Sequence, residues 1–272
     1  MDANAPIGVF DSGVGGLTVL RALRAELPGE SFVYLGDTAR LPYGTKSAET
    51  VVRYAVQAAG ALIERGIKAL VVACNTASSV ALPALQARFG SLPVLGVIEP
   101  GARAAVSGSR NGRIAVLATE GTVRGSAYQQ SILRLRPEAR VRAIACQLFV
   151  ALAEEGWVDG AVAEAAAHRY LDPLLGAPAS ERPDVIVLGC THFPVLRPVI
   201  AQLAGDAVQI VESADTTARA VHERLAAADL LAAPAAASVR FLATDGVLRF
   251  TTVGPRFLGG SIAPADVELV DL

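Results

Sequence analysis

Short apolar runs recur along the chain and alternate with segments whose apolar residues have helical spacing. Each run is continuous rather than interrupted by polar residues, which is typical of strands covered on both faces of a sheet. The runs predict strands at residues 7–10, 32–35, 69–73, 94–97, 114–118, 141–145, 185–188 and 208–211. The segments with helical spacing predict helices at 17–27, 48–65, 162–175 and 216–228. This alternation favours an α/β protein with doubly wound parallel sheets.

The chain also repeats its pattern in two halves. The predicted strand ends carry Asp11, Asp37, Cys74 and Glu99 in the first half, and Thr119, Cys146, Cys190 and Glu212 in the second. In each half, one strand ends in a cysteine that two polar residues follow, in "ACNTAS" and in "GCTHFP". We therefore predict two similar α/β halves, which pseudo-twofold symmetry would relate.

The spacing of the repeat suggests where the two domains begin and end. Residues 1–98 together with 212–272 are expected to form the first α/β domain, and residues 99–211 the second. The last segment contains two more apolar runs, "VRFLA" and "LRFTTV", and is expected to return to the first domain. The alanine-rich stretch 225–237 is expected to be a helix end followed by a connector.

Composition narrows the class of protein. Apolar residues make up 52% of the 272 residues and charged residues 18%, so a large core is expected and disorder is not. The net charge is −2 without a basic block, which argues against a nucleic-acid partner. The apolar runs are far shorter than the roughly 20 residues of a membrane span. The start "MDANAPIGVF" carries an acid where a signal peptide has basic residues, so a cytoplasmic protein is expected.

The three cysteines are candidates for chemistry because of where they stand. An odd count without a CxxC pair is typical neither of a disulfide framework nor of a zinc site. Cys74 and Cys190 each follow a predicted strand and precede polar residues, where a helix dipole favours the thiolate. Cys146 is followed by Gln-Leu-Phe-Val and is expected to pack in the core. His192 lies two residues beyond Cys190 and is the one histidine of three at a predicted strand end, so a functional role is expected for it.

A glycine-rich turn, "FDSGVGGLT", follows the first predicted strand. It departs from the dinucleotide fingerprint because position 18 is threonine, and no Gly-Lys-Ser/Thr follows as in a phosphate-binding loop. The glycines are explained by a tight turn or by a nest of N–H groups for a carboxylate. Asp11 in this turn is interpreted either as a helix cap or as a proton-transfer partner.

Two thiols at equivalent strand ends suggest a specific reaction. If the halves face each other, one thiolate takes a proton from one face of a carbon while the other thiol returns a proton to the opposite face. This exchange inverts a stereocentre. The reference pKa of a cysteine, about 8.5, makes both its protonated and ionised forms accessible. No lysine that would hold pyridoxal phosphate is evident, because Lys46 and Lys68 are not at strand ends.

Several sequence blocks resemble the glutamate racemase family, within the aspartate/glutamate racemase superfamily. They are "FDSGVGGLTVL", "GDTARLPYG", "ACNTAS", "GVIEPGARAA", "TEGT" and "GCTHFPVLRPVI", in order from residue 7 to about residue 219. The resemblance implies two α/β domains with the site between them. It also implies an isomerase without a cofactor or metal that interconverts L- and D-glutamate for bacterial peptidoglycan synthesis. Members of the family differ in oligomeric state, and the resemblance is compatible with a homodimer.

The resemblance also assigns roles to residues. It implies that Cys74 deprotonates D-glutamate and Cys190 deprotonates L-glutamate. Assisting acids are expected at Asp11, Glu154 and His192. The implied substrate-binding residues are Asp11, Ser12, Tyr43, Gly44, Asn75, Thr76, Thr122, Thr191 and His192.

Three alternatives remain beside this interpretation. An aspartate or hydantoin racemase would use the same pair of thiols with a different side-chain pocket. A ligand-binding or regulatory module would carry the same fold with inert buried cysteines. A nucleotide-dependent enzyme is disfavoured because neither nucleotide motif is present.

Overall fold

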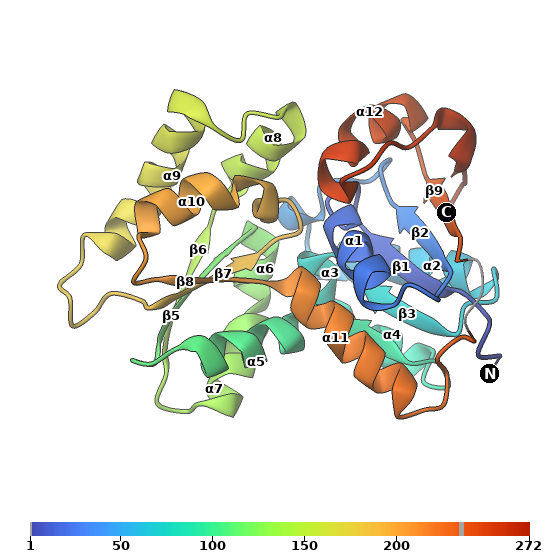
Figure 1. The fold of residues 1–272 in the computed structure, drawn as a ribbon, viewed down its shortest axis with the longest axis horizontal. Coiled ribbons are helices and arrows are strands. Elements are labelled where there is room, and N and C mark those ends of the chain that lie inside the picture. Colours follow the sequence, from blue (N-terminus) through green and yellow to red (C-terminus); the bar gives the residue numbers. More distant parts are fainter. Residues whose placement is uncertain (1, 234–236) are drawn as a thin grey trace.

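The computed structural model describes residues 2–233 and 237–272, which form two parallel β-sheets with helices on both faces (Figure 1). The larger sheet contains β1 (Ile7–Asp11), β2 (Phe32–Gly36), β3 (Ala69–Val72), β4 (Val94–Gly96), β9 (Val239–Ala243) and β10 (Val267–Leu269). The smaller sheet contains β5 (Arg113–Ala118), β6 (Arg140–Ala145), β7 (Val185–Gly189) and β8 (Gln209–Glu212). We call the part built on the larger sheet the first domain and the other part the second domain.

The helices connect these strands. In the first half of the chain they are α1 (Leu17–Glu26), α2 (Ala48–Ile63), α3 (Asn75–Val80), α4 (Leu82–Arg88), α5 (Ile98–Gly108), α6 (Glu120–Gly125) and α7 (Ala127–Leu135). In the second half they are α8 (Gln147–Glu155), α9 (Gly160–Leu175), α10 (Arg197–Ala204), α11 (Ser213–Ala226) and α12 (Val247–Leu258). Three short 3₁₀ turns complete the set: η1 (Tyr43–Thr45), η2 (Phe193–Leu196) and η3 (Pro264–Asp266).

The strand order of the smaller sheet repeats part of that of the larger sheet. The larger sheet has the order β10-β9-β2-β1-β3-β4, and the smaller sheet has the order β6-β5-β7-β8. Within each half of the chain, the first strand therefore lies between the second and the third. All registered strand pairs are parallel, so the prediction of parallel α/β sheets is confirmed.

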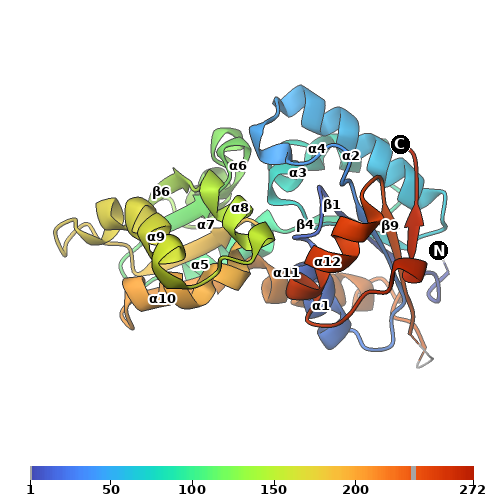
Figure 2. The same ribbon diagram turned by 90° about the horizontal axis from the view of Figure 1, so that it is seen from above.

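Helices cover the larger sheet on both faces. Figure 2 shows α2, α3 and α4 on one face, and α1, α11 and α12 on the other. A separate apolar core lies under α2, whereas the core under α1 and α11 continues through the second domain. The helix α11 packs against α1 and α5 and so joins the two domains. Burial of apolar side chains on both faces explains why these strands read as continuous apolar runs.

The smaller sheet departs from the prediction at one edge. Residues 141–145 were predicted to be covered on both faces, but β6 is an edge strand, and exposed and half-buried side chains mix along it. Arg140 and Arg142 are exposed on this strand. Charged side chains on an edge strand oppose pairing with another chain. The position of this strand at the sheet edge could not be read from its own residues, because it depends on which strands pair.

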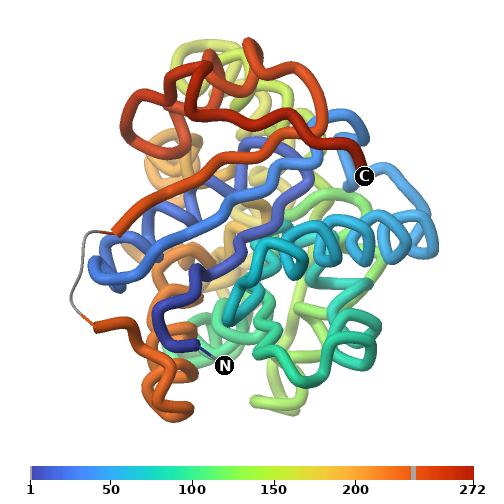
Figure 3. Tube along the Cα trace, turned by 90° about the vertical axis from the view of Figure 1, so that its right-hand side faces the viewer, coloured from blue at the N-terminus to red at the C-terminus, as the bar shows by residue number. Residues whose placement is uncertain are grey.

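The last segment returns to the larger sheet. Its first apolar run, "VRFLA", forms β9, which pairs with β2, and Figure 3 shows the two running side by side. The second run, "LRFTTV", lies within α12. The end of the alanine-rich connector, residues 234–236, lies outside the described residues. Across residues 2–233 and 237–272, every helix is too short or too polar to span a bilayer.

Candidate active site

A small cavity lies where the carboxyl ends of the two sheets face each other. Its lining comes from both domains: Ser12, Pro42, Tyr43, Gly44, Cys74, Asn75, Thr76, Thr119, Val150, Cys190, Thr191 and His192. The free volume is about 30 Å³, which holds roughly one or two water molecules. A larger ligand therefore requires the two domains, or the loops between them, to move apart.

Cys74 follows β3 and caps the amino end of α3. Its Sγ accepts a hydrogen bond from the N–H of Ala77 at 3.4 Å and lies 3.6 Å from the hydroxyl of Ser12. Burial and the nearby Asp11 carboxylate raise the pKa of the thiol to about 12. Cys74 does cap a helix, as predicted, and the N–H of Ala77 lowers the pKa of the thiol. Lost hydration and the like charge of Asp11 outweigh this effect, so the net shift is upward.

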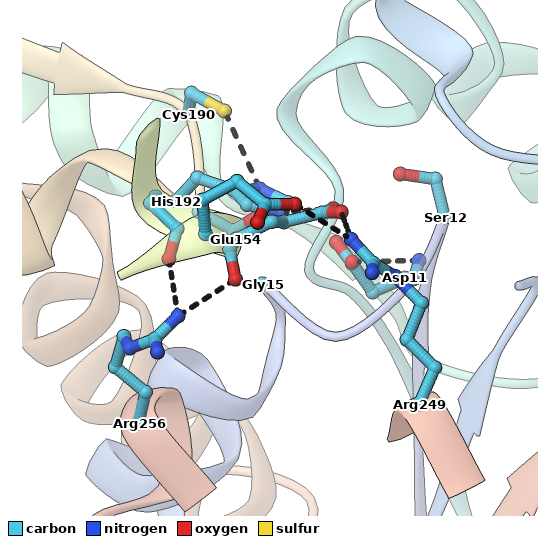
Figure 4. Close-up of polar contacts among 12 residues, drawn as sticks. Asp11, Ser12, Gly15, Glu154, Cys190, His192, Arg249 and Arg256 are labelled. Atoms are coloured by element: carbon cyan, nitrogen blue, oxygen red, sulfur yellow. Dashed lines mark hydrogen bonds and ion pairs between the residues drawn. The ribbon is translucent and has the colours of Figure 1, made fainter. Parts of the chain in front are cut away.

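Cys190 follows β7 and is paired with an imidazole. The Nδ1 atom of His192 lies 3.9 Å from the Cys190 Sγ, and the Nε2 atom lies 3.1 Å from Oε1 of Glu154 (Figure 4). Burial lowers the pKa of His192, but its contacts with Cys190 and Glu154 outweigh burial and raise it to about 10. The ring is therefore an imidazolium at neutral pH. A 3₁₀ turn follows Cys190 instead of the predicted helix, so His192 supplies the positive charge beside this thiol.

Asp11 lies behind the cavity, at the end of β1. Its Oδ2 accepts a hydrogen bond from the N–H of Gly13 at 3.0 Å, while Oδ1 lacks a hydrogen-bond partner among the described residues. The side chain is fully buried, and this burial raises the pKa of the carboxyl although His192 opposes it. The glycine-rich turn thus directs backbone N–H groups at the carboxylate of its own Asp11.

The same turn also touches the second domain. A Cβ atom at Gly15 would lie 2.5 Å from both Nδ1 of His192 and Oγ1 of Thr191. Only a glycine lets the turn approach these two side chains so closely.

The loop of η1 forms one wall of the cavity. Tyr43 is buried and donates a hydrogen bond to Asp37, whose carboxylate also accepts from Nε of Arg40 at 2.7 Å. A Cβ atom at Gly44 would lie 2.7 Å from the Thr119 side chain, so the loop rests directly on the second domain. Asp37 thereby connects the end of β2 to a residue that lines the cavity.

Side chains beside Cys74 are held across the domain boundary. The hydroxyl of Thr76 lies 2.9 Å from that of Thr119 and 3.1 Å from that of Thr122. The hydroxyl of Tyr128 donates to Oδ1 of Asn75 at 2.8 Å, which turns the amide nitrogen of Asn75 away from Tyr128. That nitrogen is buried and lacks a partner within the described part of the chain. An unpaired buried donor is typical of a site that binds an acceptor group.

The chain is similar to known racemases along most of its length. Residues 11–221 match the family model described as Asp/Glu/Hydantoin racemase. The chain is 51% identical over 267 residues to the glutamate racemase of Geobacter metallireducens, covering 98% of this chain and 96% of that protein. The chain belongs to this family. Its similarity places it among the glutamate racemases, and it is an amino-acid racemase.

Solved structures of the family have the same fold. The glutamate racemase isoform RacE1 of Bacillus anthracis superposes with a TM-score of 0.93 at 38% identity, covering 99% of this chain and 98% of that chain. The glutamate racemase of Francisella tularensis, determined in complex with D-glutamate, has a TM-score of 0.91 at 35% identity, with the same coverage.

The fold brings the predicted site residues together. Nine of them line the cavity: Ser12, Tyr43, Gly44, Cys74, Asn75, Thr76, Cys190, Thr191 and His192. The other three lie behind this lining, since Asp11 and Glu154 are near His192 and Thr122 touches Thr76. Cys146 is buried in the apolar core, as predicted. Within the described residues, no group of three or more His, Cys, Asp or Glu side chains is arranged to hold a metal ion.

Other residues reach the site without having been assigned to it from the sequence. Pro42 and Val150 line the cavity, and Tyr128 and Arg249 contact residues of the site. Pro42 directly precedes the predicted Tyr43-Gly44 pair, which is a local signal. Tyr128 and Arg249 lie within helices far along the chain, where no local pattern distinguishes them from packing or surface residues.

Proposed function

We propose that this enzyme interconverts L- and D-glutamate through two thiols, without a cofactor. The observation that carries the proposal is that Cys74 and Cys190 end topologically equivalent strands, β3 and β7, and line the same cavity. Each thiol comes from a different domain, so a substrate between the domains meets one thiol on each side. The solved relative that holds D-glutamate supports glutamate as the substrate.

In the direction from L- to D-glutamate, the thiolate of Cys190 removes the proton from Cα. The electron pair of the broken C–H bond spreads into the α-carboxylate. The thiol of Cys74 then gives its own proton to the opposite face of Cα and becomes a thiolate. The reverse direction exchanges the two roles, so each cysteine acts as a base once and as an acid once.

The charges in the site suit the first of these directions. The pKa of about 12 keeps Cys74 protonated, as its role of acid requires. The imidazolium of His192 lies beside Cys190, and Glu154 stabilises that imidazolium.

The lining offers partners for the charged groups of glutamate. The amide nitrogen of Asn75 has no partner among the described residues. With the hydroxyls of Thr76 and Thr191, it is suited to bind a carboxylate as negative charge develops on it. Just behind this lining, Asp11 has an Oδ1 without a partner among the described residues, and we propose this atom as the acceptor for the substrate ammonium group. Ser12, Tyr43 and Gly44 complete the pocket, and Thr122 supports Thr76. Closure around the substrate excludes water and strengthens these contacts.

We further propose a cellular role and a division into domains. The product D-glutamate supplies bacterial peptidoglycan synthesis in the cytoplasm, and growth of a bacterial strain that requires external D-glutamate tests this role. The domains comprise residues 1–98 with 212–272 and residues 99–211. The return of β9 and β10 to the larger sheet supports this division.

Exchange of the Cα proton tests the reaction. The protein is incubated with L-glutamate in D₂O without added cofactor, while optical rotation and deuterium at Cα are followed. We expect rotation to fall to zero and deuterium to enter at Cα. Rotation lost with aspartate but not with glutamate would reject the substrate, and no exchange with either would reject the racemase chemistry.

Three cysteine variants test the mechanism. Cys74→Ser and Cys190→Ser should each abolish conversion in both directions, because every conversion needs both groups. Cys146→Ala is the matched control, since it removes a buried thiol of the core and should leave turnover close to that of the parent. If Cys74→Ser and Cys190→Ser stay as active as Cys146→Ala, the two-thiol mechanism is wrong.

A further inference from the structure

Three residues of α12 surround the His192–Glu154 pair. Nη2 of Arg249 lies 3.0 Å from Oε2 of Glu154, on the carboxylate oxygen that His192 does not use. Nη1 of Arg256 donates to the carbonyl oxygens of Ala153 and Glu154 at 2.7 and 2.8 Å (Figure 4). The ring of Phe257 meets the imidazole of His192 edge-on, with the ring centroids 5.2 Å apart.

These contacts cross between the two domains. Along the chain, α12 follows β9 and precedes β10, and both of these strands belong to the larger sheet. Glu154, in contrast, stands on α8 of the second domain. Arg249 and Arg256 are seven residues apart, which places them on the same face of α12. That face therefore holds both the end of α8 and the carboxylate that α8 carries.

We propose that Arg249 is a positioning residue, which holds the Glu154 carboxylate against His192 and so keeps the imidazole beside Cys190. The proposal rests on the two-thiol function given above. Glu154 is the acceptor for both cations: its side chain is 14% exposed, and one oxygen faces each of them. Arg249, which is 58% exposed, reaches Glu154 from the solvent side and prevents its carboxylate from turning outward to water.

The surrounding charges determine what the loss of Arg249 would do. The charged and titratable groups that face the pair are Asp11, Cys190, Glu155, Arg249 and Arg256. His192 and Arg249 together lower the pKa of Glu154 against the opposing effect of burial. Without Arg249 the pKa of Glu154 rises, so Glu154 becomes protonated, and stops supporting the imidazolium, at a higher pH.

Replacing Arg249 tests the proposal. We expect Arg249→Gln to lower kcat/KM by about fivefold to tenfold, as the loss of one charge-assisted hydrogen bond would. The loss should be equal from L- and D-glutamate, because enantiomers have equal free energies and the equilibrium constant is one. The acid limb of the pH profile of kcat/KM should move to higher pH, and Arg249→Lys should recover most of both effects.

A matched control and a double variant separate positioning from folding. Arg240→Gln also removes an exposed arginine paired with a glutamate, but its partner is Glu268, far from the thiols. It should leave kcat/KM and the acid limb unchanged. In an enzyme that already carries Glu154→Gln, adding Arg249→Gln should cause no further loss, because Arg249 acts through the Glu154 carboxylate.

Two outcomes would overturn the proposal. One is an Arg249→Gln enzyme whose kcat/KM and acid limb match those of Arg240→Gln. The other is a full additional loss from Arg249→Gln in the Glu154→Gln background. A parent enzyme that exchanges no Cα proton would overturn the proposed function instead. In that case the titration of the His192 ring, followed by NMR, still tests the contact, because Arg249→Gln should lower the pKa of that ring.

Discussion

Replacing Gly15 by alanine isolates the contact between the glycine-rich turn and the imidazole of the second domain. The new Cβ would lie 2.5 Å from Nδ1 of His192, 2.6 Å from its Cε1 and 2.5 Å from Oγ1 of Thr191. The φ angle of Gly15 lies outside the left-handed region, so alanine fits the backbone and the effect is purely steric. Thr191 can rotate its hydroxyl away, whereas His192 has to move as a whole.

The size of that movement follows from the distances. Ordinary contact begins at about 3.4 Å, so the ring has to retreat by about 0.9 Å from its position at 2.5 Å. Phe257 and Glu154 stand against the ring, which leaves it little room. Misplacing a catalytic group by about 1 Å can cost a hundredfold in rate, so we expect kcat/KM to fall by about that factor. Overpacking should cost about 1–3 kcal/mol of stability.

The assay compares two glycine variants. Loss of rotation and Cα deuterium uptake give kcat/KM, and urea unfolding gives the stability. Gly29→Ala is the control, because a Cβ there meets no described atom within 4 Å. If Gly15→Ala keeps kcat/KM within about threefold of Gly29→Ala, then either the ring moves freely or its position does not matter, and the reasoning fails. Loss of activity with complete unfolding would also refute it, because the expected cost leaves the enzyme folded.

Three further predictions concern stability and binding. Lys68→Met should lower the free energy of unfolding, measured in urea titrations, by about 3–5 kcal/mol. In the parent protein the Lys68 ammonium lies 2.5 Å from the buried Glu30 carboxylate, and the variant leaves that carboxylate without a counter-charge. Adding Glu30→Gln should recover part of the loss. Tyr128→Phe should raise KM for glutamate more than it lowers kcat, because Asn75 loses the hydrogen bond that orients its amide; equal KM values would contradict this role. The pKa of His192 is raised from 6.5 to about 10 in the folded protein, so its charge stabilises the fold fully below pH 6.5 and ceases to do so as the pH rises through 10. The extra stability of the parent over His192→Gln, measured by urea unfolding, should therefore shrink between pH 6 and pH 10, and a constant difference would contradict the raised pKa.

Much of the fold could be predicted from local patterns. The strands around Val9, Val71 and Val187 are buried on both faces, so each needs a continuous apolar run that is visible in the sequence. The strand β6 broke the rule because its place at the sheet edge depends on which strands pair, and pairing is a long-range property. The run "LRFTTV" is apolar although it lies in a helix, because α12 buries one face against the first domain. Which surface covers that face is again a long-range property.

The two thiols were also predictable, because the carboxyl ends of parallel strands meet at one edge whatever the details of packing. The pKa of the Cys74 thiol could not be predicted in this way. The pKa of Cys74 depends on lost hydration and on Asp11, which is more than sixty residues away in the chain. A helix terminus is a local feature, whereas desolvation is the sum of everything packed around a group.

The local pattern of apolar and polar residues was enough to predict the order of the first eight strands and the placing of one cysteine at an equivalent strand end in each half. Contacts between distant segments place an imidazole beside Cys190, let Tyr128 orient Asn75 across the domain boundary, and bring Arg249 to Glu154 from ninety-five residues away. The physical reason is range. Hydrophobic periodicity acts between neighbours in the chain, but burial, charge pairing and close contact act between neighbours in space.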